Sequence, residues 1–195
     1  VEYVKAKADA NERLHRAKVT DNARVILALT AIGKDVTNVG GHNLLKGLDS
    51  MSYIKTQGIN GPIFTLIALD SHNYPTMGDV TREKLIETIL GAALEDGGWT
   101  LSGTKADPDM TDGGWDLSAE NADTDMTAMA IQALAPYYKT NETVKAAVDK
   151  ALEALSALQR NDGGFGSWGT VNSESCAQVI VALTALGIDP TADSR

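Results

Sequence analysis

Two aspartates ahead of an apolar segment are the residues whose types and spacing best suit chemistry. Asp123 and Asp125 stand two positions apart, directly before the apolar residues that begin near Thr127. A carboxyl group tuned by a neighbouring carboxyl can act as a general acid, for example toward an alkene or epoxide in a dry, aromatic-lined cavity. The alternative is structural. These aspartates, like Asp21 and Glu174, also suit helix N-termini, where carboxylates bind free N–H groups.

Aromatic residues at glycine-rich loops form a second candidate group. Trp99, Trp115 and Phe165 each follow a Gly-Gly pair, and Trp168 ends the last of these loops. On one exposed rim, such rings would stack on a sugar or another flat ligand. As a packing set, they would instead cap the ends of helical hairpins. The sequence-based ligand-binding set is Trp99, Trp115, Asp123, Asp125, Phe165, Trp168 and Glu174.

A third hypothesis concerns calcium. Asp107, Asp109 and Asp112 lie on an acidic segment that contains glycine, and their spacing is one residue away from the start of an EF-hand loop. No glutamate falls at the closing position of such a loop. The segment therefore has two interpretations, a calcium site and a solvated acidic loop. Zinc has no support, because the only cysteine, Cys176, lies in an apolar run that predicts burial, and the histidines are scattered.

The elements that would position these residues repeat along the chain. The segment from Asn22 to Asp35 recurs as the segment from Ser175 to Asp189, and two weaker copies begin at Gly61 and Thr127. Each copy is apolar nearly all round, which is typical of a helix buried by neighbours on several sides. We call these four segments the inner helices. Their central alanines are Ala28, Ala68, Ala133 and Ala182.

Segments between the inner helices carry apolar residues at intervals of three or four positions, which predicts outer helices with one face in water. They are residues 44–54, 85–93 and 144–158, preceded by a first outer helix from Tyr3 to Lys18. Outer and inner helices together predict an all-α array of about eight helices in four hairpins, each stacked on the next. We predict a single domain over residues 1–195, with an insertion loop at about 99–122, for which a short β-hairpin is considered.

The loops and inner-helix starts resemble known repeats. The stretch from Gln159 to Gly166 is similar to the Gln/Gly/Trp repeat of squalene–hopene cyclases, protein prenyltransferase β subunits and the cobalamin carriers. Residues 121–130 resemble the Asp-x-Asp-Asp-Thr-Ala stretch of class II terpene cyclases. The resemblance implies an α/α toroid, here an incomplete or open one, and a member of that superfamily on a bacterial surface protein. It would make Asp125 the general acid and Asp123 its partner.

Two departures from the cyclase pattern argue against catalysis. Met126 stands where the cyclases carry a second consecutive aspartate, and aromatic residues make up only 5% of the chain, which provides little lining for a carbocation. The cobalamin carriers show a similar stretch without being enzymes. We therefore expect a non-catalytic module that binds a small molecule, a glycan or a protein. The alternatives are a terpene cyclase or prenyltransferase-type enzyme that uses Asp125, and a purely structural spacer.

Charge and hydropathy limit the partners further. A net charge of −9 repels phosphate backbones, so nucleic acid is not expected as a partner. No apolar run reaches the roughly 20 residues of a membrane span. We expect an extracellular or cell-surface location as part of a larger protein. We also expect the open C-terminal repeat to pack on another chain or domain, because no outer helix follows the fourth inner segment.

Overall fold

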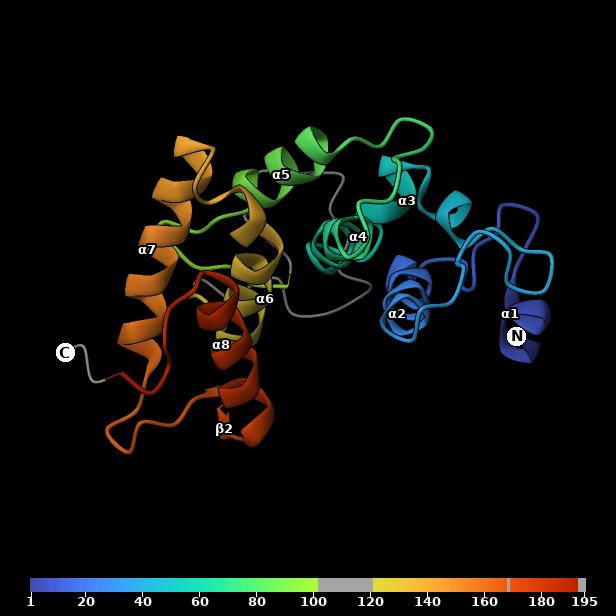
Figure 1. The fold of residues 1–195 in the computed structure, drawn as a ribbon. Helices are drawn as coiled ribbons and strands as arrows, with labels where there is room; N and C mark the ends of the chain where they lie inside the picture. Colours follow the sequence, from blue (N-terminus) through green and yellow to red (C-terminus); the bar gives the residue numbers. More distant parts are fainter. Residues whose placement is uncertain (102–120, 168, 193–195) are drawn as a thin grey trace. The chain divides into compact units, whose positions relative to one another are not determined.

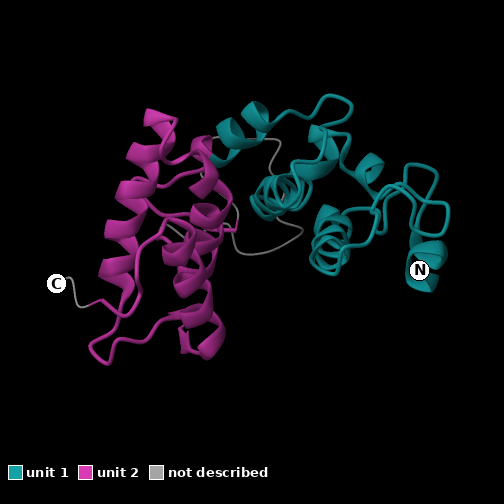
Figure 2. Ribbon diagram, viewed as in Figure 1, with its two compact units in different colours: residues 1–89, 105–115 teal, residues 90–104, 116–195 magenta. Residues whose placement is uncertain are grey.

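The structure, a computed structural model, describes residues 1–101, 121–167 and 169–192 (Figure 1). These residues contain eight α-helices, two 3-10 helices and one two-stranded hairpin, which confirms the predicted all-α fold. They form two compact units. The first comprises residues 1–89, and the second comprises the described residues from 90 onward (Figure 2). None of the described helices is long and apolar enough to cross a membrane.

The first unit is built around the packing of its two inner helices. Its elements are α1 (Glu2–Lys7), α2 (Val19–Ala31), η1 (Leu44–Leu48), α3 (Met51–Lys55), α4 (Asn60–Asp70) and α5 (Arg82–Gly91), the last of which extends two residues into the second unit. The inner helix α2 packs against both α4 and η1. Burial on several sides matches the nearly continuous apolar character of α4, whose buried residues include Ile63 and Leu66.

The predicted first outer helix, Tyr3 to Lys18, is wrong beyond Lys7. The carboxylate of Asp9 accepts hydrogen bonds from the backbone N–H groups of Asn11 and Arg13, at 2.8 and 2.9 Å. Glu12 adopts a left-handed backbone conformation with φ of 63°. Such side-chain bonds to the backbone compete with helix formation, and here they replace the helix with turns.

The second predicted outer helix, residues 44–54, is divided into η1 and α3. Ser50 ends the continuity because its hydroxyl caps α3 by accepting the backbone N–H of Tyr53. Gly47 explains the close approach of η1 to α2, since a Cβ there would lie 2.2 Å from Nδ2 of Asn22. The apolar spacing therefore identified the buried side of this segment, but not its interruption.

The second unit contains α6 (Thr124–Leu134), η2 (Ala135–Tyr137), α7 (Glu142–Leu158), β1 (Gly166–Ser167), β2 (Thr170–Val171) and α8 (Ser173–Ala185). The inner helix α6 packs against both α7 and α8. Asn141 caps α7, as its position before the apolar pattern predicts. The antiparallel hairpin pairs Gly166 with Val171 and precedes α8. The β-hairpin considered for the insertion loop falls on residues 102–120, which lie outside the described residues.

The sequence repeat extends to individual hydrogen bonds at the ends of α2 and α8. A glycine with positive φ stands two residues after the end of each helix, and the backbone N–H that follows it donates to the carbonyl of a leucine in the last turns of the helix. Two residues beyond each glycine, an aspartate accepts the backbone N–H and hydroxyl of a threonine. The matched residues are Leu29, Gly33, Asp35 and Thr37 for α2, and Leu183, Gly187, Asp189 and Thr191 for α8. The chain therefore leaves the two helices in the same local geometry.

Candidate functional site

The loop before three of the inner helices makes one shared contact. In each case a backbone N–H donates to the side chain found six positions before the central alanine of the inner helix. The pairs are Leu14 with Asn22 Oδ1 at 2.8 Å, Trp99 with Thr127 Oγ1 at 3.0 Å, and Phe165 with Cys176 Sγ at 3.4 Å. Two of these contacts come from Gly-Gly-aromatic loops, which therefore fix the entry of the chain into α6 and α8. That role requires no ligand.

Trp99 is the clearest case, because its side chain is fully buried. Its carbonyl also accepts the backbone N–H of Asp123, at 2.9 Å. A ring without exposed surface offers no platform for stacking, so Trp99 fits the packing alternative. Phe165 is also largely buried, at 8% exposure. The predicted residues Trp115, Trp168, Asp107, Asp109 and Asp112 lie outside the described residues.

Asp123 is the N-cap of α6. One of its carboxylate oxygens accepts the backbone N–H of Met126 at 2.9 Å, and the other accepts the hydroxyl of Ser167 from β1. This side chain therefore ties the start of α6 to the hairpin that precedes α8. The structural alternative for Asp123, a helix-capping carboxylate, is what the hydrogen bonds show.

Asp125 lies in the first turn of α6 and faces a buried hydroxyl. Its Oδ1 atom and the Oγ atom of Ser175 are both buried, and neither has a regular hydrogen-bond partner within the described part of the chain. Burial raises the pKa of the Asp125 carboxyl, and repulsion from Asp123 and Glu174 acts in the same direction. The hydroxyls of Ser175 and Ser167 act against the rise in this pKa.

The structure thus brings three predicted site residues, Asp123, Asp125 and Glu174, to the N-terminal ends of α6 and α8. Ser167 also belongs to this group, although no motif in the sequence singled it out. The available signal was its place in a short polar segment just before α8, where it pairs with Thr170 in the hairpin. Glu174 is exposed and accepts the hydroxyl of its neighbour Ser173, at 3.1 Å. No three metal-ligating side chains gather at any place in the described ranges.

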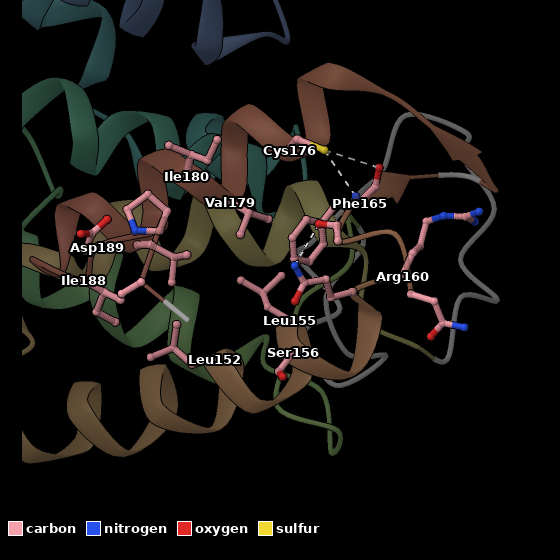
Figure 3. A pocket seen from close by; sticks show the side chains of 16 residues that line it. Leu152, Leu155, Ser156, Arg160, Phe165, Cys176, Val179, Ile180, Ile188 and Asp189 are labelled. Atoms are coloured by element: carbon pink, nitrogen blue, oxygen red, sulfur yellow. Dashed lines mark hydrogen bonds between the residues drawn. The ribbon is translucent and has the colours of Figure 1, made fainter. Parts of the chain in front are cut away.

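A groove between α7 and α8 lies in the second unit and has a volume of about 660 Å³. Leu155 of α7 and Val179 of α8 extend toward one another across it, with Phe165 at one end and Ile188 near the other (Figure 3). Polar side chains such as Arg160 stand at its border. The groove therefore combines an apolar floor with a polar rim, as binding sites commonly do.

Several groove residues are more exposed than their apolar character predicts. Ile180 and Ile188 are 48% and 40% exposed. Cys176, which the sequence analysis placed in the core, is only partly buried and lines the groove. The prediction of burial was wrong here because the apolar run around Cys176 identifies an inner helix but does not show which of its faces has a neighbour.

Comparison of the chain with models of known protein families and with curated protein sequences finds no match.

Proposed function

We propose that this chain is a non-catalytic binding module of the α/α-toroid type, and that it binds its ligand or partner in the groove between α7 and α8. The observation that carries the proposal is the exposed apolar lining of a cavity of about 660 Å³. Ligand pockets are commonly about 300–1,000 Å³ and largely apolar. Of the predicted site residues, Phe165 contributes to this lining.

The chemistry of the groove supports binding rather than catalysis. Its lining includes Cys176, Arg160 and Asp189, but it does not include Asp123 or Asp125, the carboxyls proposed for acid chemistry. Asp123 accepts two hydrogen bonds, and Met126 occupies the position of the second consecutive aspartate of the cyclase motif. The composition and the toroid-type resemblance, rather than the geometry, support an extracellular or cell-surface setting within a larger bacterial protein.

Binding of the apolar dye bis-ANS tests the proposed groove. We expect the wild-type chain to enhance the fluorescence of bis-ANS, and the double variant Ile180→Ser/Ile188→Ser to lose about half of that enhancement or more. Both side chains are substantially exposed, so their replacement should leave the fold intact. Ile32→Ser is the matched control, because Ile32 is 67% exposed at the end of α2 and lies outside the groove. Equal loss in the control, or none in the double variant, would reject the groove.

An enzyme of the terpene cyclase or prenyltransferase type is the second candidate. The observation that favours it is the direction of the Asp125 pKa shift, because a general acid is helped by a pKa above the ordinary aspartate value. In the binding proposal, by contrast, Asp125 has no catalytic role, and its carboxylate charge is destabilised because the side chain is partly buried. The variant Asp125→Asn separates the two accounts.

We expect Asp125→Asn to raise the melting temperature at pH 7 by about 1–2 °C, a small gain because Asp125 keeps contact with solvent. The folded state binds the Asp125 proton more tightly than the unfolded state, so stability falls as pH rises through the raised pKa. The advantage of the neutral asparagine should therefore shrink toward pH 4. Squalene and prenyl diphosphates should remain unconverted by either protein. Conversion by the wild type that Asp125→Asn abolishes would instead establish the enzyme.

A further inference from the structure

One face of the inner helices is buried in three of them and open in the fourth. The residue two positions before the central alanine is fully buried in α2, α4 and α6, as Ile26, Leu66 and Ile131, but 48% exposed in α8, as Ile180. The residue five positions before that alanine follows the same rule. Ala23, Ile63 and Ala128 are fully buried, whereas Ala177 is exposed. The positions that are exposed on this face of α8 are therefore the same repeat positions that are buried in the other three inner helices.

The matched helix α2 shows what covers this face. Asn22 lies one turn before Ile26, and its amide donates to the carbonyl of Leu44 in η1, at 3.2 Å. The leucines of η1, Leu44, Leu45 and Leu48, are at most 1% exposed. The counterpart of Asn22 in α8 is Cys176, which lies on the groove next to Ile180. The groove therefore occupies the place on α8 that η1 fills on α2.

The residues that follow α2 and α8 also correspond to one another. Val36 follows α2, is 1% exposed and accepts the backbone N–H of Leu44 at 3.0 Å. Its counterpart after α8 is Pro190, which is exposed and lines the groove. The turns that contain Val36 and Pro190 have the same hydrogen bonds, so Pro190 lies at the edge of the groove in the local geometry that Val36 has beside η1.

We infer that the groove between α7 and α8 binds an amphipathic helical segment of a protein partner, with leucine-type side chains spaced as in Leu44–Leu48. This inference rests on the proposed function and specifies the partner. The segment would cover Cys176, Ile180 and Pro190 by packing on α8 as η1 packs on α2, where Leu44 bonds to Asn22 and Val36. Burial of this apolar surface would drive the association, as in other sites where a helix lies in a groove.

An extended chain tests the inference. Residues 39–57 of this sequence, which contain η1 and α3, are appended directly after Ala192, because the repeat makes Ala192 the counterpart of Asn38. A tethered segment has an effective concentration near the millimolar range, so moderate affinity is sufficient to occupy the groove. We expect the reaction of Cys176 with a thiol reagent to slow by about tenfold, as it would if the groove were covered for about nine-tenths of the time.

The control carries the same extension with the copies of Leu44, Leu45 and Leu48 replaced by serine, and it should leave Cys176 as reactive as in the unextended chain. A synthetic peptide of residues 39–57, added to the unextended protein at millimolar concentration, should slow the same reaction. An unprotected Cys176 in the extended chain overturns the helical partner. If bis-ANS still binds the unextended groove, the proposed binding function survives that failure. If bis-ANS does not bind, both fail.

Discussion

Replacing Trp99 with alanine is expected to lower the free energy of unfolding by about 3–5 kcal/mol. The ring is fully buried, and the backbone of the same residue bonds to Thr127 and Asp123 at the start of α6. A cavity of this size next to the first turn of an inner helix removes packing that the surroundings replace only in part. Urea unfolding followed by far-ultraviolet circular dichroism is the suitable measurement, because the substitution itself alters tryptophan fluorescence.

The conservative variant Trp99→Phe is the control, and we expect it to retain more than half of the lost stability because it keeps an aromatic ring in the site. A ligand-stacking role would give the opposite pattern, in which Trp99→Ala changes binding and leaves unfolding within about 1 kcal/mol of the wild type. That outcome would contradict the packing role assigned to this residue.

Replacing Gly98 with alanine is expected to cost about 3 kcal/mol or more, since overpacking against backbone and core side chains leaves little room for relaxation. A Cβ at Gly98 would lie 2.2 Å from Cβ of Ala122 and 2.8 Å from Oγ1 of Thr127. The second clash falls on the hydroxyl that accepts the backbone N–H of Trp99, so the entry into α6 should be disturbed as well.

The loop before α8 supplies a matched control for this prediction. Gly164 occupies the position of Gly98 there, but a Cβ would lie 3.2 Å from Oδ1 of Asp162, whose exposed side chain can shift, and 3.8 Å from Cγ1 of Val171, an ordinary van der Waals contact. We expect Gly164→Ala to cost about 1 kcal/mol or less. Thermal unfolding of both variants measures the difference. Equal costs would show that the close approach at Gly98 does not determine the stability of this loop.

The inner helices could be predicted from the sequence because their repeat combines apolar character with recurrent ends. The pattern around Ala28 and Ala182 identifies two of them, and their shared Gly-x-Asp-x-Thr exits form the same hydrogen bonds. The capping role weighed for Asp123 is confirmed for the same reason, since a carboxylate before an apolar helix has a local partner in the backbone.

The parts that sequence reasoning missed depend on contacts beyond the local segment. The turn at Asp9 replaces most of the first outer helix because one carboxylate binds two backbone groups. The exposure of Ile180 depends on which neighbour is present, and its sequence context is nearly that of the fully buried Ile26. A periodic pattern identifies a helix and its apolar character, but it does not show which of its faces will be covered.

The central claim is that the apolar groove between α7 and α8 is a binding face of the kind that η1 covers on α2. The most direct test is the bis-ANS fluorescence of three proteins: the unextended chain, the chain extended with residues 39–57, and the extended chain with the three leucine copies replaced by serine. We predict strong enhancement in the first and third and little in the second, because the tethered helix occupies the dye site. Equal enhancement in all three proteins would contradict the claim.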